Sequence, residues 1–217
     1  MSNVSLIVRR IINNRPLLYE AIVNEIVNFA NLANHIKSNV ENELGEEVTN
    51  QSIVMSLRRY AKTLEKKENP KNNFKFNSQI IMTTGLCDVA FVKGPTLLKK
   101  LKGVYDLLNE DNGHTLNIIH GNYEVSIVAC QNYIDKILKL LEGEKVLNID
   151  KNLVSLAMSF SKDFLYTAGV LAKVTRKLHW ENINIYENIS TLTENIFIVS
   201  KKDAMKAYNA LSEIVEN

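Results

Sequence analysis

Residues 49–66 carry cationic and amide side chains at helical spacing. At about 100° per residue, one side of such a helix is apolar and faces a core, with Ile53, Val54, Leu57, Ala61 and Leu64. The opposite side is polar and cationic, with Ser52, Met55, Arg59, Lys62 and Lys66, and Gln51 and Arg58 flank it. Residues 49–76 hold 7 Lys and Arg against 2 Asp and Glu. This side suits phosphates and base edges, so it predicts nucleic-acid binding; the alternative is a solvated face on a dimerisation bundle.

The elements around this segment are also helical. Residues 5–12 have the pattern of a short amphipathic helix. Pro16 suits the first turn of a second helix, which is expected to extend to Ile26. A third helix runs from Asn28 to Leu44 and ends at Gly45, and Thr49 caps a fourth that runs to about residue 65. This order resembles a helix-turn-helix or winged-helix module, although the third helix is long for that motif. Residues 66–77 are expected to be a linker or a small wing.

Enzyme and metal chemistry have no candidate residues. The sequence lacks GxxxxGK[ST], GxGxxG, HExxH and GxSxG motifs. Its four histidines are scattered, and its two cysteines, Cys87 and Cys130, lie outside any CxxC spacing. We therefore expect a protein that is not an enzyme and that holds no metal and no cofactor. Short apolar runs and the absence of a signal-peptide pattern predict a cytoplasmic protein without a membrane span.

After Ser78 the pattern changes to short strands that alternate with helices. The predicted strands are 79–83, 86–92, 115–120, 123–129, 145–149, 153–160, 183–189 and 196–200, and the predicted helices are 95–109, 131–141, 168–180 and 203–215. This order predicts an α+β fold with two ferredoxin-like βαββαβ units in tandem. The expected domains are 1–77 (helical), 78–150 (first unit) and 151–217 (second unit).

The second unit carries a recognisable pattern. Its elements are Gly169-Val170-Leu171-Ala172, Asn182-Ile183-Asn184, Ile189-Ser190-Thr191 and Glu194. In this order they resemble the ACT family, as found at the C-terminus of aspartokinases, over about residues 151–215. Ala168 stands where the family usually has proline. Residues 78–150 resemble a degenerate first ACT copy, in which Gly94-Pro95 opens the first helix.

The resemblance implies a small-molecule sensor. ACT domains typically bind amino acids between the strand-to-helix loop of one copy and the second strand of a partner copy. The implied ligand-binding residues are Ser161, Asp163, Thr167, Gly169, Asn182 and Asn184. A helix N-terminus at Gly169 attracts a carboxylate, and Asp163 could meet an α-ammonium group. Alternatively, Gly169 simply starts a helix and Asn184 lies in a satisfied interface.

Two functions are compatible with these features. The first is a DNA-binding regulator that responds to an amino acid, with an N-terminal reader of double-stranded DNA and two ACT sensors. The alternative is a stand-alone ACT regulatory subunit that controls a partner enzyme and uses its N-terminal helices for docking or dimerisation. In either case we expect a homodimer or a higher homo-oligomer, because ACT-like sheets leave an edge strand unpaired.

One topological expectation concerns residues 79–83. The second unit, 153–215, lacks a final strand, while the first unit already has four without 79–83. We therefore expect strand 79–83 to complete the sheet of the second unit, so that the two units interlock.

Overall fold

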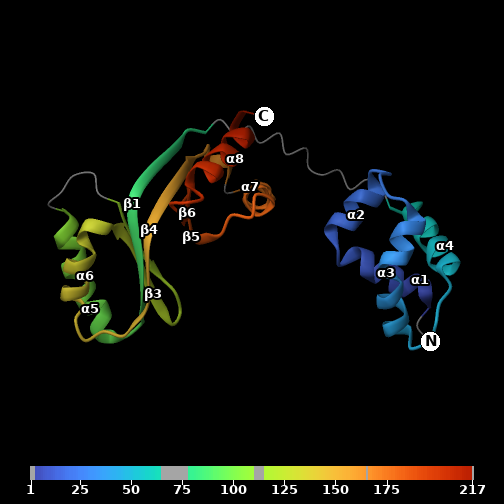
Figure 1. Cartoon of the computed structure of the whole chain (residues 1–217), viewed down its shortest axis with the longest axis horizontal. Helices are drawn as coiled ribbons and strands as arrows, with labels where there is room; N and C mark the ends of the chain where they lie inside the picture. The colour runs from blue at the N-terminus through green and yellow to red at the C-terminus, as the bar shows by residue number, and fades with distance from the viewer. Residues whose placement is uncertain (1–2, 65–77, 110–114, 165, 217) are drawn as a thin grey trace. The chain divides into compact units, whose positions relative to one another are not determined.

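A computed structural model of the chain describes residues 3–64, 78–109, 115–164 and 166–216. The chain divides into two compact units, residues 1–71 and residues 72–217 (Figure 1). In the described part, the first unit holds four helices: α1 (Val4–Asn13), α2 (Pro16–Val23), α3 (Phe29–Leu44) and α4 (Asn50–Ala61). Within its own described residues, the second unit combines a six-stranded sheet with four helices longer than one turn.

The second unit alternates strands with helices along the chain. In order, these elements are β1 (Ile80–Val92), α5 (Pro95–Asn109), β2 (Leu116–His120), β3 (Glu124–Cys130), α6 (Ile134–Leu140), β4 (Val146–Ser159), α7 (Val170–Trp180), β5 (Ile185–Ser190), β6 (Glu194–Ser200) and α8 (Ala204–Glu216). None of the helices that the structure describes is long and apolar enough to cross a membrane.

The helices of the first unit begin at the expected caps. The side chain of Asn28 accepts hydrogen bonds from the amides of Ala30 and Asn31 at the start of α3, and Thr49 accepts one from the amide of Ser52 at the start of α4. Gly45 ends α3 with φ 79°.

Two helix ends differ from expectation. Helix α2 stops at Val23 instead of continuing to Ile26, because Glu25 adopts φ 58°. The amides of Glu25 and Ile26 then donate to the carbonyls of Ile22 and Ala21, which closes the helix. Helix α4 ends at Ala61, several residues before the expected position 65.

The core of the first unit lies between α1, α3 and α4. Its fully buried side chains include Ile12, Ile36, Ile53 and Leu57. The predicted apolar stripe of α4 therefore faces this core, and Val54, Ala61 and Leu64 pack at its border.

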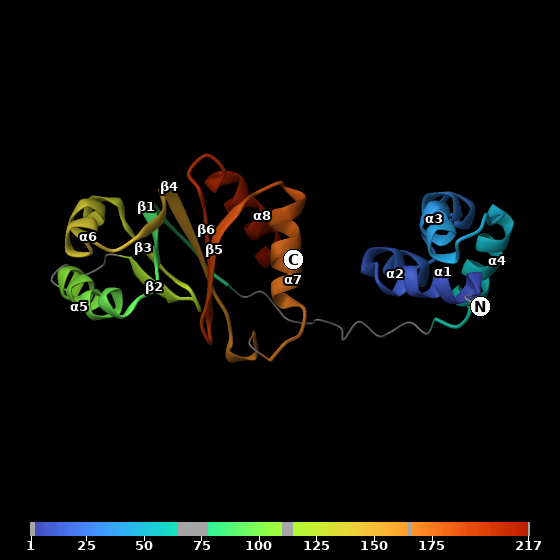
Figure 2. The same cartoon turned by 90° about the horizontal axis from the view of Figure 1, so that it is seen from below.

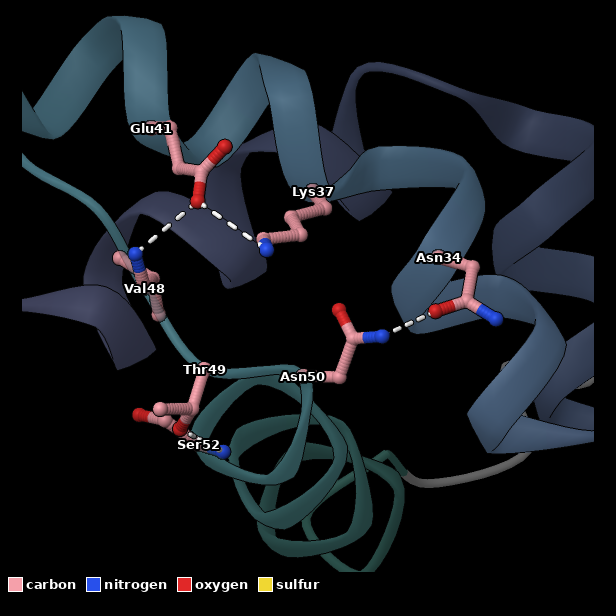
Figure 3. A network of polar contacts seen from close by, with 7 residues as sticks. All are labelled: Asn34, Lys37, Glu41, Val48, Thr49, Asn50 and Ser52. Carbon is pink, nitrogen blue, oxygen red and sulfur yellow. Dashed lines mark hydrogen bonds and ion pairs between the residues drawn. The ribbon is translucent and has the colours of Figure 1, made fainter.

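A polar network fixes the connection between α3 and α4 (Figure 3). Glu41 accepts a hydrogen bond from the amide of Val48 at 3.0 Å and pairs with Lys37 at 3.5 Å. The side-chain amide of Asn50 donates to the side chain of Asn34. These contacts hold the start of α4 against α3 and so determine which side of α4 faces outward.

The strands of the second unit form one antiparallel sheet in the order β2-β3-β1-β4-β6-β5. Residues 80–83 of β1 pair with residues 155–158 of β4, and pairing of β1 with β3 begins only at Leu86. The predicted neighbour of strand 79–83 is confirmed. The expected division into separate strands is wrong, because 79–83 and 86–92 belong to β1 and 145–149 and 153–160 belong largely to β4.

Each long strand is irregular at its middle. Gly85 in β1 has φ 73° and Asn152 in β4 has φ 58°, and the β1–β4 register shifts at these positions. These are conformations that glycine and asparagine tolerate and most other residues avoid. The strands can therefore bend without ending, which is why turn-like residues here did not mark separate strands.

The bend folds the helix-free face of the sheet onto itself (Figure 2). Helices α5 and α6 pack on β1 and β3 around Phe91 and Ile127, and α7 and α8 pack on β4 and β6 around Leu156 and Phe197. On the other face, strands from both halves share one cluster of buried side chains, namely Leu86, Val128, Leu153 and Ile198. Glu187 of β5 hydrogen-bonds Ser126 of β3, and a flat sheet would hold these two strands roughly 19 Å apart across four strand spacings, so the sheet is strongly curved.

Candidate effector site and the cationic face of α4

The segment between β4 and α7 contains four of the predicted ligand residues, and the structure describes the side-chain environment of three of them. Ser161 is exposed and Thr167 is half-buried, and Gly169 stands immediately before α7 with φ 85°. The rings of Phe160 and Phe164, both buried, stack with their centroids 4.2 Å apart. This stack anchors the segment to the core between the sheet and helices α7 and α8.

Helix α7 begins without a side-chain cap. The carbonyl of Gly169 accepts a hydrogen bond from the amide of Lys173 at 3.0 Å, so Gly169 occupies the position before the first helical residue. The first amides of a helix have no intrahelical acceptor, and together with the helix dipole they attract a carboxylate. The backbone conformation of Gly169 lets such a group approach closely.

Asn195 adds an unexpected polar group at this end of the sheet. Its side chain is fully buried, and neither its amide nitrogen nor its amide oxygen has a hydrogen-bond partner among the described residues. In β6 it lies opposite Met158 of β4, on the helix-covered face. The amide of Phe160 donates to the carbonyl of Thr193 at 2.7 Å, so the segment that leads to α7 leaves the sheet two residues from Asn195.

A buried amide without partners is unfavourable by about 1–3 kcal/mol. Such a group indicates a site where a ligand or an ordered water supplies the missing hydrogen bonds. The sequence prediction missed Asn195 because it began the strand at Ile196. The alternation with Phe197 and Val199 would have placed residue 195 on the buried face.

The other predicted ligand residues lie elsewhere or beyond description. Asn182 and Asn184 are exposed at the opposite end of α7, a helix of 11 residues and therefore roughly 16 Å long. Asn182 has φ 54°, and the amides of Asn182 and Ile183 close the end of α7 on the carbonyls of His179 and Leu178. Asn184 precedes β5. The side chain of Asp163 lies outside the described part of the chain.

A second polar group lies between the two halves of the sheet. Ser126 of β3 donates a hydrogen bond to Asp88 of β1, and Glu187 of β5 hydrogen-bonds the same serine. Burial is the main cause that raises the pKa of both carboxyl groups. The carboxylates of Asp150 and Glu124 also raise the pKa of Asp88, and those of Asp88 and Glu124 also raise the pKa of Glu187. In the described part of the chain, no group of three or more His, Cys, Asp or Glu is placed to hold a metal ion.

The polar side of α4 points away from the core as predicted. Gln51, Met55, Arg58, Arg59 and Lys62 are exposed and Ser52 is half-buried, while Lys66 lies outside the described residues. Arg58, Arg59 and Lys62 form no ion pair with any residue that the structure describes. The geometry therefore leaves three cationic side chains available to an anionic partner.

No protein-family model matches the chain, and no curated protein sequence matches it either. Several solved structures do match the chain. Aspartate kinase from Clostridium acetobutylicum is similar over 63% of this chain and 34% of its own length, with 19% identity and a TM-score of 0.53. A structure of aspartokinase alpha and beta subunits matches over 64% of this chain and 97% of its own, at 17% identity and a TM-score of 0.53. The ligand-free regulatory subunit of aspartate kinase from Thermus thermophilus matches over 62% and 95%, at 15% identity and a TM-score of 0.50.

These similarities define the fold of the matched part of the chain, 62–64% of its length. Its mixed helix and antiparallel-sheet architecture is that of aspartokinase regulatory domains, which supports an ACT-type fold. The chain spans about a third of the whole Clostridium kinase but nearly all of the Thermus regulatory subunit.

Proposed function

We propose that this chain is an amino-acid-responsive regulatory protein that acts on a partner enzyme. The observation that carries the proposal is the buried, unpartnered amide of Asn195 in β6, the strand paired with the one that leads into α7, in a fold shared with aspartokinase regulatory domains. This is the alternative of the two functions set out above. The similarity to regulatory subunits favours it over a DNA-binding regulator.

The chemistry of an amino-acid effector fits these groups. Its carboxylate would accept hydrogen bonds from the first amides of α7, beyond Gly169. The amide of Asn195 offers one donor group and one acceptor, so it can bind either a carboxylate oxygen or an ammonium group. Ser161 and Thr167 would add hydroxyl groups, and Asp163 remains the predicted partner of the ammonium group.

Asn182 and Asn184 join such a site only from another copy of the chain. They lie a full helix length from Gly169 within one chain, whereas the ACT resemblance places the second strand of a partner copy against the loop. We therefore propose a homodimer in which β5 and the residues before it approach the β4–α7 segment of the other copy.

A thermal-shift screen of the full chain against the common amino acids tests the effector site. A true effector at 100 times its Kd should add about 2.7 kcal/mol to the free energy of unfolding. The increase should disappear in Asn195→Leu and persist in Asn117→Leu, a half-buried asparagine of β2 in the other half of the sheet. Absence of stabilisation by every amino acid would contradict the proposal.

Double-stranded DNA remains the competing partner for the helical unit, supported by the exposed cationic side of α4. If DNA were the partner, affinity for a duplex should fall steeply with salt, with a log-log slope of about −0.9 per neutralised phosphate. A chain that binds no duplex at low salt would exclude that hypothesis and leave the partner-enzyme function.

A further inference from the structure

The helical unit contains a groove of about 780 Å³ between the end of α2, the chain before α3 and the outer side of α4. This volume falls within the range of pockets that hold ligands or several side chains of a partner. Four of the residues predicted above to contact nucleic acid line it: Met55, Arg58, Arg59 and Lys62. The cationic side of α4 is therefore the wall of a hollow and not a smooth surface.

The floor of this groove is apolar. Ile22 is buried, and Val27, Phe29 and Leu64 are partly buried against the core of the unit. Met55 is 44% exposed at the edge of the floor. A flexible thioether at such a place adapts to apolar side chains of different shapes.

The charges of the groove are one-sided. Its cationic wall holds Arg58, Arg59 and Lys62, against a single lining carboxylate, Glu25. As noted above, the three cations form no ion pair with a described residue. An occupant that matches both the apolar floor and the cationic wall must combine apolar side chains with carboxylates. Duplex DNA would meet the charges but would leave the apolar floor without a partner.

Contacts with α1 hold the cationic wall in place. The guanidinium of Arg9 lies 5.1 Å from the centre of the Tyr60 ring, and the hydroxyl of Tyr60 donates to the side chain of Asn13. The hydroxyls of Ser56 and Ser5 lie 3.1 Å apart. A wall that is fixed before binding lowers the entropic cost of association.

We propose that this groove binds an acidic amphipathic helix of the partner protein. The apolar side chains of that helix, at positions i, i+3, i+4 and i+7, would fill the floor, and its carboxylates would pair with the wall of α4. The inference rests on the proposed function, since it supplies the contact by which the regulatory chain reaches its partner.

A pair of synthetic peptides tests the groove on the full chain. Both are labelled helices of about 18 residues, or five turns, with the same leucine stripe; one carries glutamate on its flanks and the other lysine. By fluorescence anisotropy, the glutamate peptide should bind at least about tenfold more tightly, and the difference should shrink with added salt.

Substitutions in the chain localise the binding. Arg58→Glu with Arg59→Glu should weaken the glutamate peptide by at least about tenfold, and Met55→Glu should weaken both peptides. Lys99→Glu reverses an exposed charge on α5, in the other unit and outside the groove, and should leave binding unchanged. Circular dichroism should show the same helix content and Tm in all variants that are compared.

Three results would overturn the inference. They are equal affinity for the two peptides, binding that Met55→Glu leaves unchanged, and no binding of either peptide while a duplex binds to the same face. The effector screen on the same preparation separates the two proposals. Stabilisation by an amino acid without peptide binding refutes only the groove, whereas peptide binding without any effector refutes only the sensor.

Discussion

Asn195 is the residue on which the proposed effector site most depends. Its buried amide has no partner among the described residues, so it destabilises the ligand-free fold by about 1–3 kcal/mol. Asn195→Leu replaces the amide by an apolar side chain of similar size among Met158, Phe197 and Val199. We expect this variant to raise the free energy of unfolding without ligand by about 1–2 kcal/mol and to lose stabilisation by the effector. Urea denaturation with and without the amino acid measures both effects.

Asn195→Ala provides the matched control. It also removes the amide, but it leaves a cavity, so the ligand-free protein should gain less stability or lose some. If Asn195→Leu is instead less stable than the wild type, the amide has partners in solution and is structural.

The pair Asp88 and Glu187 predicts a pH dependence. Burial raises the folded-state pKa of both carboxyl groups, so the folded protein favours their protonated forms more than the unfolded chain does. Their contribution to stability is then fully present below the ordinary carboxyl pKa. It is lost as pH rises through the raised values, where ionised Asp88 and Glu187 face each other across Ser126.

Glu187→Gln isolates this contribution. The neutral amide keeps the shape and can still hydrogen-bond Ser126. We expect the variant to become progressively more stable relative to the wild type as pH rises from about 4 to 7, because only the wild type must also ionise a carboxyl group at position 187, next to Asp88. Denaturation midpoints at several pH values give the difference, and Glu142→Gln, at an exposed position after α6, should show no such trend. A difference that is independent of pH would contradict the prediction.

At the level of elements, the two sides of α4 have different tasks. Leu57 is fully buried between α1 and α3, and Arg59 is exposed. Leu57→Ala should therefore lower the free energy of unfolding by about 2–5 kcal/mol, while Arg59→Glu should change it by less than about 0.5 kcal/mol. Thermal denaturation followed by circular dichroism measures both. Loss of helicity in Arg59→Glu would show that this side is buried.

Elements whose ends depend on local chemistry were predictable from the sequence. Thr49 and Gly45 delimit helices through caps that act within a few residues, and the hairpin after β2 is closed by the amide of Gly121 and the carbonyl of Glu124 at 2.9 Å. The strand neighbours of residues 80–83 were also predictable, because an unpaired strand needs a place in a sheet.

Features that depend on distant parts of the chain were not predictable. Gly85 and Asn152 resemble turn residues, and only pairing between β1 and β4 makes them bends within continuous strands. Asn195 resembles an ordinary polar residue at a strand end until α7, α8 and the segment after β4 cover it. Asn182 was assigned to ligand binding by motif, whereas its left-handed backbone also ends α7.

At the scale of the whole molecule, the sheet has two edges that no other described strand covers. Within the described ranges, β2 and β5 each pair with one strand, and Tyr186 on β5 is exposed. Because unpaired edges invite pairing with another chain, we expect a homodimer or a higher oligomer in solution. Light scattering coupled to gel filtration measures the molar mass directly. A mass equal to one chain of 24.7 kDa at all concentrations would exclude the effector site that two copies share.

The shared sheet also connects the proposed effector site to the strand with which the second unit begins. Asn195 of β6 lies opposite Met158 of β4, and Met158 lies opposite Ile80 of β1. Ile80 is the first residue of the strand that follows the connection to the helical unit. A ligand that binds Asn195 would therefore act two strands away from the residue where the chain enters the sheet. Binding could then shift the conformational equilibrium at the start of β1 without a separate relay.

The last prediction concerns residues 78–85. They precede the strands of the first half of the sheet in the sequence, but residues 80–83 pair with β4 in the second half. Residues 80–83 cover the edge of β4 at residues 155–158, and Ile80 and Met82 pack against the core beneath α7 and α8. A fragment of residues 86–217 loses these contacts and exposes an apolar strand edge. It should be less stable than a fragment of residues 78–217 by at least about 3 kcal/mol, the cost of emptying one or two large core positions. Urea denaturation of both fragments measures the difference, and Ile81→Ala in the longer fragment is the control because Ile81 is 56% exposed. Equal midpoints for the two fragments would show that β4 does not need this partner, and the proposed route from the effector to the helical unit would then lose its physical basis.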